Sequence, residues 1–441
     1  MEKVVGKVRW VNMVLLWLTY EINYLDRVAI LVFLPLIRQD LGLTHAQAGQ
    51  AASIFFFFYA LSQLFLGGLA DRVRPTRMMQ FAIGLFSVAT FFTGMMRNFA
   101  QFAILRAVLG LGEAIHMPPI FRSIANWFPV QEKARAMAIL SLAWGVGPAF
   151  LPALLVFLHS VFGGWRGVFS CLFVVGIVAI ILVGLVIQDD PDKARQKGRL
   201  SEEEYQYIKK GLLQVDSSGE RKLSLKEQAA ITLGDLSFWA YSLVWFFGLA
   251  AGWGVAAWVP SFLYEQHKFN LAAMGLMAGL PYLFAGLGQI TAGWCTDKYL
   301  QGKSRWAIAA SYVVCVPVLY YLSTVKTGQV VPLIICLVLL GFCVYFPHPV
   351  LYGYFQRRYP KETVGFSMGF SNGLGQFGSF IAPLIMGYMI VRTGNTIYYG
   401  NAFMFLSILA LCAAVVALFM SEKQYEFRKK LTIVTETQVK A

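Results

Sequence analysis

Seven ionisable side chains lie inside two long apolar stretches in the first half of the chain. One stretch contains Glu21, Asp26 and Arg27, and the other contains Arg106, Glu113, His116 and Arg122. Ionisable groups inside a membrane-spanning helix are costly and rare, so each one is a candidate for ligand binding or proton transfer. We therefore expect the chemistry of this protein to lie on these two stretches.

The carboxylates Asp26 and Glu113 are candidates for proton transfer. Arg106, Gly110 and Glu113 share one stripe of a helix, because seven residues make nearly two turns. A carboxylate in a partly dry cavity near an arginine can bind and release a proton near neutral pH. We predict that Asp26 and Glu113 couple to protons, with Arg106 in support. The alternative is that both carboxylates only form salt bridges, with Arg27 and Arg106.

Arg27 is the candidate for binding an anionic substrate, because its planar guanidinium can pair with a carboxylate through two hydrogen bonds. The alternative is an internal ion pair with Asp26. Glu21 is a further carboxylate, either a second proton site or a partner for a substrate cation. His116, one turn after Glu113, either tunes that carboxylate or packs as a structural histidine.

The composition requires a membrane around these residues. The chain of 441 residues is 58% apolar with a mean hydropathy of +0.60, and only 14% of it is charged, against about 25% in soluble domains. Apolar stretches of about 20 residues can cross a bilayer as helices. They lie near 10–34, 47–69, 78–97, 100–126, 134–159, 166–188, 236–264, 271–295, 305–324, 330–354, 363–391 and 398–420.

We therefore predict an all-α integral membrane protein with 12 transmembrane helices in two six-helix bundles. The expected parts are residues 1–188, a central loop 189–235, residues 236–420 and a tail 421–441. In the central loop, Ser201 and Glu204 form a capping-box pattern, which predicts a short amphipathic helix on the membrane surface.

The basic residues predict the orientation. Of the 37 lysines and arginines, 28 lie at the N-terminus, in the central loop, in the tail and in the loops on that same side. This bias predicts cytoplasmic termini in the cell (inner) membrane. The net charge of +14 then reflects topology and anionic lipid, and we expect no nucleic-acid partner.

The sequence offers no support for catalysis. The six cysteines have no zinc-like spacing, and there is no nucleophile elbow, phosphate-binding loop or nicotinamide fingerprint. We expect no enzyme activity, no metal and no cofactor other than a proton gradient.

A repeated motif links the two halves. Gly67, Asp71 and Arg72 recur in register as Gly293, Asp297 and Lys298, 226 residues later. Each glycine permits close helix contact, and each basic residue can anchor to headgroups. Two such strings at matching places indicate duplication, with a conformational role.

The twin motif and the 6+6 pattern resemble the major facilitator superfamily. Three strings resemble its anion:cation symporter branch: Asn23-Tyr24-Leu25-Asp26-Arg27, Arg106 to Ala114, and Gly164-Trp165-Arg166. The resemblance implies proton coupling at Asp26 and Glu113, and contact between Arg27 and the acid group of the substrate.

Five further positions are candidates for substrate binding. Tyr59 and Gln63 lie one turn apart after a phenylalanine string that resembles the family's, although packing is an equal alternative for Tyr59. The resemblance implies a contact at Asn372, with Gln376 one turn on. Trp144 stands near a position that is polar in some sugar-acid transporters, which argues against a heavily hydroxylated substrate.

We therefore expect a monomeric secondary transporter that carries an organic anion with protons by alternating access. Trp245, Tyr345 and His348 would give the second half a more apolar lining. The alternative is a proton-driven exporter of an amphipathic metabolite or drug, which the Gly145–Pro148 string favours.

Overall fold

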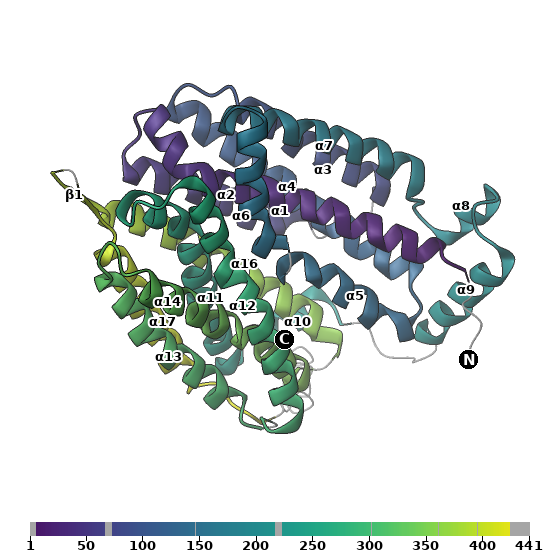
Figure 1. The fold of residues 1–441 in the computed structure, drawn as a ribbon. Helices are drawn as coiled ribbons and strands as arrows, with labels where there is room; N and C mark the ends of the chain where they lie inside the picture. The colour runs from purple at the N-terminus through teal and green to yellow at the C-terminus, as the bar shows by residue number, and fades with distance from the viewer. Residues whose placement is uncertain are drawn as a thin grey trace. The chain divides into compact units, whose positions relative to one another are not determined.

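The computed structural model describes residues 6–66, 73–145, 147–216, 223–300, 302–359, 361–394 and 396–423 (Figure 1). The chain forms two compact units. The first comprises Met1–Glu220 and Ala256–Tyr282, and the second comprises Arg221–Val255 and Leu283–Ala441.

The first unit is helical. Its elements are α1 (Val8–Asp40), α2 (His45–Leu66), α3 (Pro75–Thr93), α4 (Phe99–Trp127), α5 (Val130–Gly145), α6 (Gly147–Val161), α7 (Trp165–Val186), α8 (Pro191–Gln196), α9 (Glu202–Asp216) and the π-helix η1 (Phe262–Gln266). It also takes the end of α11 (Leu236–Ser261) and the start of α12 (Leu271–Lys298).

The second unit holds the rest of α11 and α12 together with the remaining elements. These are α10 (Leu225–Leu233), α13 (Ser304–Thr324), α14 (Val330–Tyr345), α15 (Pro347–Arg358), α16 (Lys361–Met389), β1 (Val391–Thr393), β2 (Thr396–Tyr398) and α17 (Gly400–Ala417). Strands β1 and β2 pair antiparallel as a short hairpin between α16 and α17, which the sequence did not predict.

Each predicted membrane span coincides with helix. Three of the predicted spans run over two helical elements each: α5 with α6, α11 with η1, and α14 with α15. Gly145, Gly147 and Pro148 lie at the first break, and Pro347 lies at the last. Among the described residues, seven helices are long and apolar enough to cross a membrane, or eight if α5 and α6 make one span. The all-helical membrane architecture is confirmed, and the number of twelve crossings stays a prediction.

Two glycines hold α4 between α2 and α3. A Cβ atom on Gly110 would lie 2.4 Å from the carbonyl oxygen of Phe55 in α2, and one on Gly112 would lie 3.0 Å from the backbone nitrogen of Phe86 in α3. Because a side chain at either position would push the helices apart, these glycines set how deeply α4 sits. Glu113 follows directly and is fully buried.

The central segment differs from its prediction. Ser201 accepts a hydrogen bond from the Glu204 amide at 3.3 Å, as a cap should. The carboxylate of Glu204 does not complete the capping box, and bonds instead to the Val8 and Arg9 amides and to the Arg9 guanidinium at 2.9 Å. That half of the prediction is wrong, because a buried arginine offers charge-assisted bonds that are stronger than a local cap. Helix α9 is thereby fastened to the start of α1.

Candidate functional site

The centre of the candidate site is an ion pair between Arg27 of α1 and Glu113 of α4. Arg27 Nε and Nη2 both donate to Glu113 Oε2, at 2.9 and 2.5 Å. The side chains are 5% and 0% exposed. Oε1 of Glu113 has no hydrogen-bond partner among the described residues, so one of the two carboxylate oxygens could still bind a proton.

Three aromatic rings surround the Arg27 guanidinium. Its Cζ lies 5.0 Å from the ring centre of Tyr24, 4.9 Å from that of Phe55 and 5.0 Å from that of Tyr59. A cation over an aromatic face is stabilised by about 0.5–2 kcal/mol for each ring, more when water is excluded. Arg27 is therefore held in place by α1 and α2 as well as by its ion pair.

Tyr59 and Gln63 lie on the α2 side of this centre. The ring of Tyr59 stacks on Phe55, with centroids 5.7 Å apart, and Gln63 forms a side-chain contact with it one turn later. Tyr59 is buried and Gln63 half-buried. The structure thus brings Tyr59 to Arg27, and Gln63 to Tyr59.

Arg106 does not pair with Glu113. It is fully buried, and it donates to the carbonyl oxygens of Ala51 at 3.1 Å and Ala52 at 3.3 Å, with Cζ 4.5 Å over Phe55. Its charge therefore fastens α4 to α2. Of the alternative in which the carboxylates only form salt bridges, the structure shows the Arg27–Glu113 pair, and among the described residues it shows no salt bridge of Arg106 with Glu113 or Asp26.

Asp26 lies next to Arg27 in sequence and faces another helix. Its side chain is 2% exposed, its polar neighbour is Thr90 of α3, and Oδ1 has no hydrogen-bond partner among the described residues. The ion pair of Arg27 is formed with Glu113 instead. Asp26 is therefore a second buried carboxylate with an unused oxygen.

Glu21 and His116 lie away from the Arg27–Glu113 pair. The carboxylate of Glu21 rests on Gly147, where a Cβ atom would come within 2.1 Å of Oε2, and its Oε1 has no described partner. His116 is fully buried with its ring against Phe86, and neither ring nitrogen has a described partner. Trp144 is half-buried at the end of α5, and its Nε1 also lacks one.

The second unit gathers a polar and aromatic cluster around Trp245 of α11. Its Nε1 donates to Asn372 Oδ1 of α16 at 3.3 Å, and its ring passes over Gly375, whose Cβ would lie 2.2 Å away. The rings of His348 and Tyr352 in α15 lie 4.9 and 5.3 Å from it. Gln376 is half-buried one turn after Asn372. The sequence analysis missed Tyr352, although it lies one turn after His348.

The duplicated motif is only partly visible. Gly67, Asp71, Arg72 and the side chain of Asp297 lie outside the described residues. The ammonium of Lys298 lies 5.4 and 5.2 Å from the rings of Trp294 and Tyr299. A Cβ atom on Gly293 would meet no described atom within 4 Å, so the expected close helix contact is not seen there.

A further buried ion cluster was not foreseen from the sequence. Arg38, at the end of α1, donates to Glu265 Oε1 of η1 from Nε at 2.9 Å and from Nη2 at 2.7 Å, while His45 Nε2 lies 2.8 Å from Oε2. Glu265 is 1% exposed. This cluster ties α1 and α2 to a segment more than 200 residues away.

Comparison with known proteins gives the family. The model described as Major Facilitator Superfamily matches residues 16–383 and 272–436. A probable L-galactonate transporter of Escherichia coli is 28% identical over 400 residues, covering 88% of this chain and 84% of the relative. A probable sulfoacetate transporter of Cupriavidus necator is 29% identical over 426 residues, covering 94% of each chain.

A solved structure shares the fold. A bacterial homologue of the human lysosomal transporter Spinster, in an inward-facing and occupied conformation, aligns with a TM-score of 0.76 at 16% identity, covering 94% of this chain and 97% of its own. Together with the family model and the transporter relatives, this shared fold places the residues described above in a transporter scaffold. This chain belongs to the major facilitator superfamily.

Proposed function

We propose that this protein is a proton-coupled symporter of an organic anion and that it works by alternating access. The observation that carries the proposal is the Arg27–Glu113 pair, a buried cation bound to one oxygen of a titratable carboxylate. The relatives support the substrate class, because galactonate and sulfoacetate are both small organic acids.

Charge balance explains how proton and substrate are coupled. The ionised pair is neutral, so a substrate carboxylate that reached Arg27 would leave an excess negative charge in a water-poor site. Such a charge is costly unless it is neutralised. A proton on Glu113 removes the excess and releases the guanidinium for the substrate. Proton and anion therefore enter the site together, which is symport.

Asp26 supplies the second proton site in this scheme. It is buried one residue from Arg27 with an unused oxygen, but on another side of α1. Glu113 carries its proton while the substrate is bound. When the site closes to one side of the membrane and opens to the other, we propose that this proton is exchanged with Asp26. We assign Tyr59, Gln63 and Trp144 to the substrate in the first unit, and Asn372 and Gln376 in the second.

Counterflow and gradient-driven uptake in proteoliposomes test the proposal. A radiolabelled sugar acid or sulfonated acid should accumulate when the outside is acidic, and a protonophore should abolish the accumulation. Arg27→Lys should lose most of the uptake, because a single ammonium cannot reproduce the planar fork. Accumulation against, rather than with, the proton gradient would identify an exporter and reject symport.

A further inference from the structure

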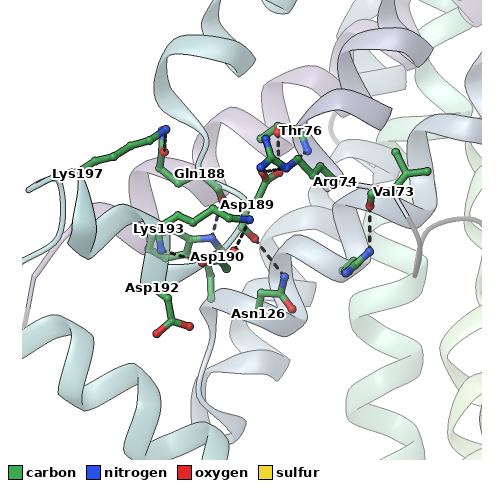
Figure 2. Close-up of polar contacts among 12 residues, drawn as sticks. Val73, Arg74, Thr76, Asn126, Gln188, Asp189, Asp190, Asp192, Lys193 and Lys197 are labelled. Carbon is green, nitrogen blue, oxygen red and sulfur yellow. Dashed lines mark hydrogen bonds and ion pairs between the residues drawn. The ribbon is translucent and has the colours of Figure 1, made fainter.

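A polar pocket lies at the ends of α3 and α7, remote in sequence from the Arg27 site. It has a volume of about 380 Å³ and is lined mainly by Arg74, Thr76, Gln188, Asp189, Lys193 and Lys197. Figure 2 shows Arg74, Lys193 and Lys197 around the segment that joins α7 to α8. Three cations and one lining carboxylate give the pocket an excess of positive charge.

The acidic residues of the pocket are occupied by structural bonds. Asp189 Oδ1 accepts from the Thr76 amide at 3.1 Å and from its hydroxyl at 2.6 Å, so it caps the start of α3. Asp190, beside the pocket, caps α8 through the Lys193 amide at 2.8 Å (Figure 2). These carboxylates build the walls of the pocket and offset only part of its charge.

The cations remain accessible. Arg74 is 55% exposed, and its Nε lies 3.9 Å from Asp189 Oδ2, which is beyond hydrogen-bond distance. Lys193 is 41% exposed, and its ammonium forms an ion pair at 2.9 Å with Asp190 Oδ2, on a side chain that is itself 29% exposed. The exposed Lys197 donates to the neutral Gln188 side chain at 3.2 Å. Each can therefore bind an anion without breaking a buried contact.

Apolar surface adjoins the pocket on α7. Ile181 and Leu185 lie one turn apart and are 53% and 61% exposed. On one side of this ridge Gly184 lines the pocket, and on the other Leu182 and Val186 line an apolar groove of about 420 Å³ against α1. Successive residues of α7 are rotated by about 100°. The ridge formed by Ile181 and Leu185 therefore lies between Gly184, at the pocket, and Leu182 and Val186, at the groove.

We propose that the pocket binds the phosphate headgroup of an anionic glycerophospholipid, whose acyl chains lie on the Ile181–Leu185 ridge and in the α1–α7 groove. A basic pocket at the end of membrane helices recognises such a headgroup. Free inorganic phosphate shares the charge but has no chain to occupy the apolar ridge and groove.

Native mass spectrometry of the purified full chain tests this site. The probe is an equimolar mixture of phosphatidylglycerol and phosphatidylcholine with identical chains. The wild type should prefer phosphatidylglycerol, and each lost cation should reduce that preference about fivefold. The double variant Lys193→Gln, Lys197→Gln should thus lose about 25-fold, while Lys226→Gln, an exposed lysine in α10, should lose nothing.

Two further variants test the charge and the chain. Asp190→Asn keeps a good helix cap but removes a negative charge, so the preference should rise about fivefold. Leu185→Gln should weaken lipid retention without changing the phosphatidylglycerol preference. Thermal unfolding of every variant verifies the fold.

Two results would overturn the proposal. One is an undiminished phosphatidylglycerol preference in the folded double lysine variant. The other is a combination of two observations: 10 mM inorganic phosphate displaces the bound lipid, and Leu185→Gln leaves lipid retention unchanged. Together they would identify a site for free phosphate.

Discussion

Replacing Glu113 with glutamine should separate anion binding from proton coupling. Arg27 Nε and Nη2 both donate to Glu113 Oε2, so in the proposed mechanism the substrate displaces this oxygen from Arg27. Hydrogen bonds to a charged acceptor contribute about 1.5–3 kcal/mol, against about 1 kcal/mol for a neutral one. Across the two bonds, glutamine should therefore hold Arg27 less tightly by about 1–4 kcal/mol, so the anion should bind about 5- to 700-fold more tightly.

The same substitution should remove the pH dependence of binding. Wild-type affinity should fall as pH rises, because an ionised Glu113 retains Arg27. The Glu113→Gln variant should bind equally well from pH 5.5 to 8.5, exchange substrate in counterflow, and fail to accumulate it. The three rings around Arg27 partly offset the lost counter-charge, so the variant should still fold.

Scintillation proximity binding of a labelled carboxylate substrate measures this directly. Thermal unfolding, together with the variant Glu203→Gln on the exposed face of α9, controls for general effects of losing a carboxylate. If Glu113→Gln keeps the wild-type slope of affinity against pH, the coupling proton is bound elsewhere and the charge-balance argument fails.

Three other predictions follow from the described contacts. We expect Glu21→Gln and Gly147→Ala to impair uptake alike, because a Cβ atom on residue 147 would lie 2.1 Å from Glu21 Oε2 and would displace that carboxylate. Gly145→Ala meets no atom within 4 Å and should be neutral in uptake assays. Glu265→Gln should lower thermal stability by about 3–5 kcal/mol, because it leaves Arg38 with no carboxylate in a largely buried pair, and an unchanged unfolding temperature would show the cluster to be dispensable. The hydrogen bonds from Lys209 and Tyr205 lower the pKa of Asp192, so their stabilising contribution is present above about pH 4 and is lost as the pH falls through the lowered pKa. The protection of α9 amides against hydrogen exchange, relative to the intrinsic exchange rate at each pH, should therefore fall below about pH 4 by the equivalent of less than about 1 kcal/mol, and Asp192→Asn should remove this dependence.

The pairing of the buried charges could not be obtained from sequence neighbours. Asp26 and Arg27 are adjacent, but successive side chains on a helix point about 100° apart, so they face different helices. Arg106 and Glu113 share a stripe, yet the Arg106 guanidinium donates to the Ala51 and Ala52 carbonyl oxygens of α2 and not to Glu113. Packing of α4 through Gly110 and Gly112 brings Glu113 to Arg27 instead.

The same limit applies to the contacts between distant segments. Ser201 acts as a cap, as its local pattern predicts, but the Glu204 carboxylate is taken by Arg9, 195 residues earlier. Arg38 and Glu265 are 227 residues apart, and neither stretch carries a signal for the other. Local patterns report propensity, whereas a buried charge pairs with whichever opposite charge the fold brings within reach.

The sequence by itself determined the all-helical membrane architecture, the family and the two helices on which the buried charges of the first half gather. It could do so because a segment inside lipid must be helical and mostly apolar, and a charged side chain there is costly. Long apolar runs and the few charges within them are therefore visible in the sequence. Only the tertiary structure decided that Arg27 pairs with Glu113, that Arg106 fastens α4 to α2, and that Arg74, Lys193 and Lys197 share one pocket. These choices depend on distances between helices, which helix packing sets and no single segment encodes.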